Sequence, residues 1–218
     1  MKLPFTAEQF YGVFAAYNES VWPAQWLLLG LALLALALVA VPRRASGLVV
    51  SAILGVLWLW LGLAYHLAFF TAINPLAYVF AAVSVAGGLV FLWQGVVKRR
   101  LRFRLSLGAQ GLAGLALVVF SLAVYPAWLA YSGHRYPALP TFGLPCPTTI
   151  FTIGMLAFLV APYPRSPIVA PLLWCLVGAQ AALLLGISQD LGLVAAAAVG
   201  VVLLFRSKAT ARVAKSAP

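Results

Sequence analysis

The stretch YSGHRYPALPTFGLPCPTTIFT, from Tyr131 to Thr152, is the longest interruption in an otherwise apolar chain. It holds four prolines, one of the two histidines and one of the two cysteines. Because proline fixes φ and removes a backbone donor, the stretch cannot simply be helix. It also carries large apolar residues that need to be buried: Tyr131, Tyr136, Leu139, Phe142 and Leu144. We therefore expect an ordered cap over a helical bundle, with Tyr136 and Phe142 buried.

The composition on both sides of this stretch is that of an integral membrane protein. Hydrophobic residues make up 65% of the 218 residues and charged residues 8%, whereas soluble proteins have about 45–50% and about 25%. A soluble fold could not cover its surface with so few charges. The net charge of +11 does not indicate nucleic-acid binding, because the basic residues cluster at the ends of apolar runs.

Apolar runs long enough for spans predict the fold class, an all-α integral membrane bundle of seven transmembrane helices in a domain of residues 22–205. The expected spans are residues 24–41, 48–70, 75–97, 105–130, 147–161, 168–187 and 191–205. In the fourth span, glycines permit close helix approach and Pro126 predicts a kink. The loop of residues 131–149 is the extracytoplasmic cap between helices four and five. The basic tail, residues 206–218, is expected to be disordered and cytoplasmic.

Residues 1–21 predict a short amphipathic helix. Thr6 and Gln9 have the spacing of a capping box. Apolar residues follow at steps of three and four: Phe10, Phe14, Tyr17 and Val21. Such a helix lies either in the membrane interface or packed over the mouth of the bundle, and the sequence leaves both placements open.

The basic residues predict the topology. Twelve of the fourteen fall on one side of the seven expected spans. The positive-inside rule makes that side cytoplasmic, so the N-terminus is expected outside and the C-terminus inside. All three acidic residues and both histidines then lie on the outer side.

The chemically versatile side chains are thereby expected to surround a small pocket that faces outward. The predicted ligand-binding residues are Glu19, His66, Asn74, His134, Cys146 and Asp190. His66 is the sharpest candidate, because an ionisable group within an apolar helix is costly to bury without a partner. The alternative is a neutral imidazole hydrogen-bonded to the backbone or to the cap. The N-terminus of the fifth span, at Pro147, would offer free N–H groups and suit a small anionic solute.

Binding or translocation of a small solute is the function that this arrangement favours. The alternatives are a membrane-embedded enzyme with Cys146 as nucleophile and His66 or His134 as base, and a structural or assembly protein with no ligand. Neither catalytic residues nor a cofactor are predicted beyond these alternatives. His66, His134 and Cys146 lack local metal-ligand spacing, so a metal site stays open. The bilayer is the expected partner, nucleic acid is not, and the oligomeric state is not predicted.

Several stretches carry a resemblance that covers nearly the whole chain: PFTAEQF, YNESVWP, AYHLAFFTAINP, GHRYPALPTFGLPCPTTIFTIG and LLGISQD. In them the chain resembles an uncharacterised family of bacterial multi-pass membrane proteins, the domain of unknown function family 6064. The resemblance implies a bacterial inner (cytoplasmic) membrane location. It implies no assigned activity, and there are no catalytic residues to carry over.

Overall fold

Helices dominate the computed structural model, which describes residues 4–133, 135–185 and 187–216. The α-helices are α1 (Ala7–Ser20), α2 (Ala24–Ala40), α3 (Ser46–Trp60), α4 (Ala77–Phe91), α5 (Ala109–Val119), α6 (Tyr125–Tyr131), α7 (Pro145–Leu156), α8 (Ser166–Leu185) and α9 (Gly192–Ser216). The π-helical turns η1 (Leu61–Leu67), η3 (Leu92–Val97) and η4 (Phe120–Val124) continue α3, α4 and α5, while η2 (Phe70–Ala72) and η5 (Ser188–Leu191) are 3-10 turns. No β-strand occurs in these ranges, so the predicted all-α class is confirmed.

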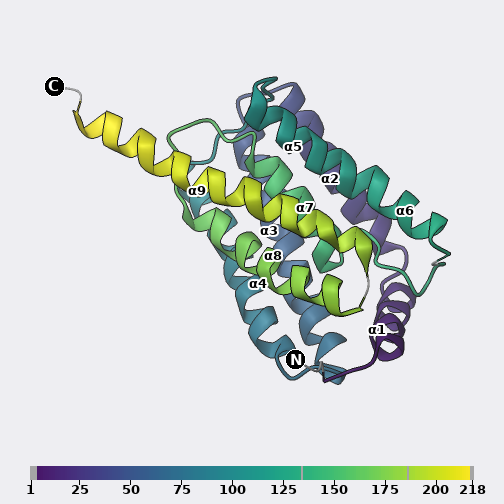
Figure 1. Ribbon diagram of the computed structural model, residues 1–218. Coiled ribbons are helices and arrows are strands. Elements are labelled where there is room, and N and C mark those ends of the chain that lie inside the picture. Colours follow the sequence, from purple (N-terminus) through teal and green to yellow (C-terminus); the bar gives the residue numbers. More distant parts are fainter. Residues whose placement is uncertain (1–3, 134, 186, 217–218) are drawn as a thin grey trace.

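Four helical stretches in the described residues are long and apolar enough to cross a membrane. They are Ser46–Ala72, Ala77–Val97, Ala109–Tyr131 and Ser188–Ser207. Together α1 and α2 would count as a fifth span, but they meet at an angle of 87°. In Figure 1, α1 accordingly lies at the lower end of the bundle, beside the ends of the long helices.

The N-terminal helix α1 packs over the mouth of the bundle. Its capping box is formed, since the Gln9 N–H donates to Thr6 Oγ1 at 3.2 Å and the Thr6 N–H donates to Gln9 Oε1 at 2.8 Å. Its apolar stripe is buried in a cluster with residues of η1 and η2: Phe10, Val13, Phe14 and Tyr17. The predicted helix is therefore confirmed. Of the two placements that the sequence left open, the structure shows the helix packed over the mouth of the bundle.

The short helix α7 lies at the centre of the bundle (Figure 1). All of its residues except Cys146 are buried, and it packs against α5, α8 and α9. Its 12 residues reach only about 18 Å, against a hydrocarbon core of about 30 Å. The residues directly before and after α7, Leu144 and Ala157, are buried, so protein surrounds both of its ends. A Cβ on Gly114 of α5 would lie 2.7 Å from the Gly154 carbonyl oxygen, so the predicted close helix approach is found here.

We predicted a kink at Pro126, which is the second residue of α6. The structure has a π-helical turn, η4, directly before α6. Proline cannot donate to the carbonyl four residues earlier, and its ring clashes with that carbonyl. The helix therefore widens to a π turn over Phe120–Val124 instead of breaking.

One buried side chain, Asn18 of α1, holds the cap onto the bundle. Asn18 is completely buried. Its Nδ2 donates to the carbonyl oxygens of Pro137 at 2.7 Å and Leu139 at 2.8 Å. Its Oδ1 accepts from the Thr141 hydroxyl at 2.7 Å, and its carbonyl oxygen accepts from the Tyr136 hydroxyl at 3.1 Å. The cap is thus anchored by polar contacts as well as by apolar packing.

The predicted burial of the cap aromatics is only partly found. Phe142 is half-buried, with its ring centroid 5.4 Å from that of Phe151. Tyr136 is 49% exposed, so the prediction that it is buried is wrong. The reason is that Tyr136 reaches Asn18 through its hydroxyl alone, which leaves much of the ring outside.

Tyr17 of α1 makes a second contact with the cap. Like the rest of α1, it lies outside the four long apolar stretches. Its hydroxyl accepts from Trp60 Nε1 at 2.7 Å and donates to the Gly143 carbonyl oxygen at 3.4 Å. Burial raises the pKa of Tyr17 to about 12. The hydroxyl therefore stays protonated at neutral pH and keeps both contacts.

The fourth span does not begin at Leu105, as predicted, but at Ala109. The preceding segment, residues 98–108, is not helical, because backbone partners elsewhere hold it. The Arg104 N–H donates to the Phe158 carbonyl oxygen at 2.9 Å, and the Leu105 N–H donates to that of Val39 at 3.1 Å. The basic tail also departs from expectation, since α9 continues to Ser216 through the segment predicted to be disordered.

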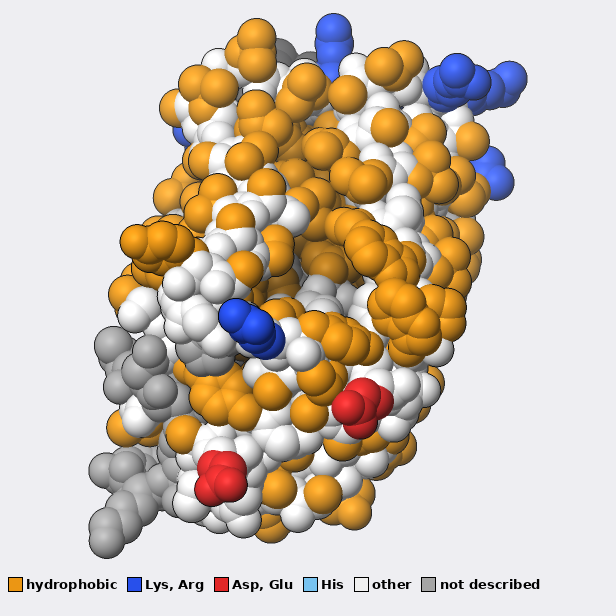
Figure 2. Space-filling model, turned by 90° about the vertical axis from the view of Figure 1, so that its right-hand side faces the viewer, with side chains coloured by type: hydrophobic (Ala, Val, Ile, Leu, Met, Phe, Trp, Pro, Cys, Tyr) orange, Lys and Arg blue, Asp and Glu red, His pale blue; other side chains and the backbone are white. Residues whose placement is uncertain are grey.

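Charge divides the molecule into two ends. Figure 2 shows basic side chains mainly at the upper end, a broad hydrophobic surface below them, and two acidic side chains toward the lower end. Of the three carboxylates, Glu8 and Glu19 are exposed and Asp190 is buried. We call the end with Arg43, Arg44 and residues 98–104 the basic end, and the end with the three carboxylates the acidic end.

Candidate ligand-binding site

A cavity of about 180 Å³ lies at the acidic end, where α1, η1, α7, α8 and η5 meet. Seven aromatic side chains of the described chain form most of its wall: Phe5, Phe10, Phe14, Tyr65, Phe70, Phe80 and Trp174. The ring centroids of Tyr65 and Phe70 are 5.6 Å apart, and those of Phe80 and Trp174 are 5.3 Å apart. These are favourable stacked and edge-to-face arrangements, so the wall is held in place without a ligand.

The polar side of the cavity is the carboxylate of Asp190, in η5. Asp190 is 2% exposed, and its Oδ1 accepts from the Tyr125 hydroxyl at 2.5 Å. The thiol of Cys146, in the first turn of α7, lies close to this carboxylate. Neither partner carries a positive charge, and no lysine or arginine is among the described residues that line the cavity.

The N-terminus of α7 faces this carboxylate instead of offering an open anion site. The helix begins at Pro145, and neither Pro145 nor Pro147 has an N–H group. The Thr148 N–H already donates to the Leu144 carbonyl oxygen at 3.2 Å. The positive end of the helix dipole is therefore next to a fixed anion, Asp190, and few donors remain for a second one. This geometry gives no support to the small anionic solute that the sequence predicted.

His66 lies behind the aromatic wall. It is completely buried in η1, and its ring centroid is 4.8 Å from that of Trp174 and 5.8 Å from that of Phe80. Neither of its ring nitrogens has a hydrogen-bond partner among the described residues, and the same holds for Trp174 Nε1. The alternative of a histidine hydrogen-bonded to the backbone is therefore not found. The indole of Trp174 lies close to the Cys146 thiol.

The structure brings together three of the six residues predicted from the sequence. Asn74, Cys146 and Asp190 line the cavity, and His66 packs against the outside of its wall. Glu19 does not line it and is exposed on α1. His134 lies outside the described residues. Asn74 also has a structural role, because its Oδ1 accepts from the Leu76 N–H at 3.0 Å just before α4.

The surroundings of Cys146 do not suit a nucleophile. Its contact is the carboxylate of Asp190, so a thiolate there would place two negative charges side by side in a buried site. His66 makes no hydrogen bond to it, and a base must reach the proton that it removes. Within the described ranges, no group of three or more His, Cys, Asp and Glu side chains could hold a metal ion.

Sequence reasoning missed Trp174, Tyr125 and Asn18. Trp174 carried a signal, because tryptophan prefers membrane interfaces and this one lies well inside the sixth predicted span. Asn18 carried one too, since it follows Tyr17 and stands four residues after Phe14 on the buried side of α1. Tyr125 carried none, because its partner Asp190 is 65 residues away in sequence.

Comparison with known proteins yields a family and no function. No curated protein and no solved structure matches the chain. The model of a family of unknown function, DUF6064, matches residues 7–215. That match covers nearly all of the chain, including α1 to α8 and α9 except its last residue, and confirms the family to which its sequence motifs pointed. The chain belongs to the family of unknown function DUF6064.

Proposed function

We propose that the chain binds a small organic cation, an amine or a quaternary ammonium compound, in the cavity at the acidic end. The observation that carries this proposal is the buried Asp190 carboxylate beside seven aromatic side chains, with no basic residue in the lining. Aromatic faces attract cations, most strongly where water is excluded, and aromatic cages recognise quaternary ammonium groups. A buried carboxylate without a positive partner is costly, and an arriving cation would offset that cost.

The rim of the cavity supports an amphipathic ligand. Leu76, Val177 and Leu184 belong to the lining and are 59%, 38% and 49% exposed. A ligand with an apolar body could therefore pass over this rim to place its charged group near Asp190. The volume of about 180 Å³ is below the range of about 300–1,000 Å³ for drug-sized ligands, so the solute would be small.

Binding is favoured over translocation by the packing below the cavity. Among the residues that the structure describes, none lines both this cavity and the pocket at the basic end. The central helix α7 is packed on all sides, with Phe151 and Met155 completely buried. A translocation step would require α7 to move, whereas binding requires no change of fold.

For the membrane arrangement we propose seven spans in a bacterial inner membrane, with the acidic end outside. The separation of basic and acidic residues to opposite ends supports this orientation. The enclosed position of α7 supports counting it among the spans despite its length. Reporter fusions after Arg104 and at the C-terminus should report the cytoplasm, and a fusion at Ala138 should report the outside. The opposite result at any of the three would refute this orientation.

The binding proposal is tested by titrating the purified full chain in detergent with choline and following tryptophan fluorescence. We expect saturable binding that the uncharged carbon isostere of choline does not reproduce. Asp190→Asn should weaken choline binding by about 30-fold or more, because the charge-assisted contact is lost. The matched control is Glu19→Gln, which removes an exposed carboxylate at the same end and should change affinity by less than about twofold. Equal binding of the isostere, or equal effects of the two substitutions, would refute the proposal.

A further inference from the structure

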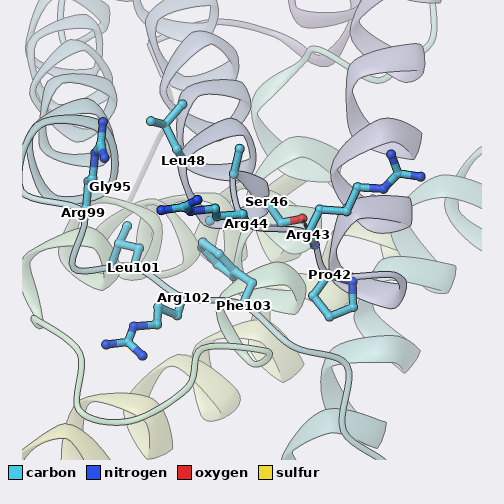
Figure 3. Close-up of a pocket in the computed structure, with 12 residues that line it drawn as sticks. Pro42, Arg43, Arg44, Ser46, Leu48, Gly95, Arg99, Leu101, Arg102 and Phe103 are labelled. Atoms are coloured by element: carbon cyan, nitrogen blue, oxygen red, sulfur yellow. Dashed lines mark hydrogen bonds between the residues drawn. The ribbon is translucent and has the colours of Figure 1, made fainter.

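The basic end has a pocket of its own, of about 510 Å³. It lies between the turn that joins α2 to α3 and the segment that follows α4. Four arginines belong to its lining: Arg43, Arg44, Arg99 and Arg102. In Figure 3 the side chain of Arg44 extends toward the side on which Arg99 lies, whereas Arg43 and Arg102 point outward.

Backbone contacts fix the arginines of residues 98–104 in place. The Arg100 N–H donates to the Gln94 carbonyl oxygen at 2.8 Å, and the Arg102 carbonyl oxygen accepts from the Val160 N–H at 2.9 Å. Leu101 and Phe103 are buried, so the arginines that alternate with them face outward. The backbone of this segment is therefore ordered before an anion arrives, and only the arginine side chains have to be ordered on binding.

Arg99 adds a sign of strain at this pocket. Its φ is +51°, which is the left-handed region and is unfavourable for a residue with a Cβ. Positions of this kind persist where the surrounding structure requires them, and they concentrate at functional sites. Here the conformation places a guanidinium on the wall of the pocket.

The first turn of α3 supplies further donors. Ser46, Gly47 and Leu48 line the pocket at the start of the helix. The Ser46 N–H already donates to the Arg43 carbonyl oxygen at 3.0 Å, so the donors available to an anion are the N–H groups of Gly47 and Leu48. Helix N-termini favour anions for this reason and because of the helix dipole. The site needs a glycine here, because a Cβ on Gly47 would lie 2.5 Å from the Leu101 carbonyl oxygen.

No carboxylate neutralises this end of the molecule. The chain has only three acidic residues, and all three belong to the acidic end. The lining of the pocket within the described chain contains no aspartate or glutamate. Arginines held close together without counter-charges repel one another, so an external anion would stabilise them.

The level of the pocket in the membrane indicates which anion that is. Trp93 is 52% exposed and lies under Lys98, with Nζ 4.8 Å from the ring centroid. Exposed tryptophans mark the membrane interface. Val41, Val97 and Leu107 nearby in the chain are 66%, 60% and 74% exposed, as residues facing acyl chains are. The pocket therefore lies at the depth of lipid headgroups.

We propose that this pocket binds the phosphate group of an anionic phospholipid, between Arg44, Arg99 and the first turn of α3. The arginines bind the phosphate oxygens and the α3 N–H groups complete the contact, while the acyl chains lie against the exposed apolar residues. The proposal does not depend on a ligand at the acidic end.

The test uses the full chain, freed of lipid in detergent, and native mass spectrometry. The probes are phosphatidylglycerol, zwitterionic phosphatidylcholine and inorganic phosphate. We expect phosphatidylglycerol to be retained in preference to phosphatidylcholine, and Arg44→Gln with Arg99→Asn to weaken its binding by about tenfold or more. Asparagine is chosen at Arg99 because it tolerates a positive φ.

The matched control is Arg104→Gln with Arg135→Gln, which removes the same charge. Both residues are exposed, and neither lines this pocket. Retained binding in this control supports the proposal. Equal weakening in both double variants means general electrostatic attraction and overturns it. Binding of inorganic phosphate at the same arginines without retention of phosphatidylglycerol overturns the assignment to a lipid.

Discussion

Different kinds of hydrogen bond hold the two ends of the bundle together. At the acidic end most hydrogen bonds to the cap come from Asn18: its side chain bonds three cap residues, Pro137, Leu139 and Thr141, and its backbone carbonyl oxygen accepts from Tyr136. At the basic end, backbone groups of residues 98–105 pair with backbone groups of other segments, such as Arg104 with Phe158. One substitution can therefore open the acidic end. Substitution of the arginine side chains leaves these backbone hydrogen bonds intact, so the arginines are not needed to hold this end together.

Asn18→Ala should give the largest loss of stability. It leaves the carbonyl oxygens of Pro137 and Leu139, in part-buried hydrogen bonds, without their donor, at a cost of about 1–3 kcal/mol each. We expect the free energy of unfolding to fall by about 3 kcal/mol, measured by denaturant titration in mixed micelles. Its exposed neighbour Glu19 is the control, and Glu19→Ala should cost less than about 0.5 kcal/mol. Similar losses in both variants would show that Asn18 does not anchor the cap.

Gly47→Ala is the corresponding change at the basic end. The added Cβ would lie 2.5 Å from the Leu101 carbonyl oxygen, which is backbone and cannot swing aside. We expect a loss of about 1–3 kcal/mol, the usual cost of overpacking, together with weaker retention of phosphatidylglycerol. Gly12→Ala is the control, because no atom lies within 4 Å of that Cβ, and it should stabilise α1 by about 0.5–1 kcal/mol. If Gly47→Ala caused no loss of stability, the start of α3 would not be packed closely against the backbone at Leu101.

His66→Phe should have the smallest effect. The imidazole has no hydrogen bond among the described residues to lose, and phenylalanine suits the surrounding rings, so we expect a change within about 1 kcal/mol of zero. The comparison variant is Thr152→Val, which removes the acceptor of Trp58 Nε1 at 3.1 Å and should cost about 1–3 kcal/mol. If His66→Phe proved the more damaging of the two in thermal unfolding, the imidazole would have a partner that the present geometry does not contain.

Periodicity and composition predicted the parts of the fold that depend on nearby residues. The capping box of Thr6 and Gln9, the buried stripe of α1 and the distortion before Pro126 were all readable from local sequence. The start of the fourth span was not, because Leu105 is apolar but its N–H is bonded to Val39 on another helix. Local pattern cannot foresee such a distant backbone partner.

The candidate site was likewise predictable only in part. Asp190, Cys146 and Asn74 could be grouped from the sequence because topology alone puts them at one end. The expected sign of the ligand charge depended on where α7 begins. With its start at Pro145 rather than Pro147, the positive end of the helix dipole lies beside Asp190 and few N–H groups remain for an anionic ligand, so we propose a cation instead. A shift of two residues in one helix boundary thus reverses the chemistry expected of the pocket.

The central claim is that the two ends bind ligands of opposite charge, independently of each other. The most direct test measures both ligands on the same three proteins: the natural chain, Asp190→Asn, and Arg44→Gln with Arg99→Asn. We predict that Asp190→Asn loses choline binding and keeps phosphatidylglycerol, and that the double variant keeps choline binding and loses phosphatidylglycerol. If either variant weakened both ligands equally, or if neither ligand bound the natural chain, the account of two separate sites would be contradicted.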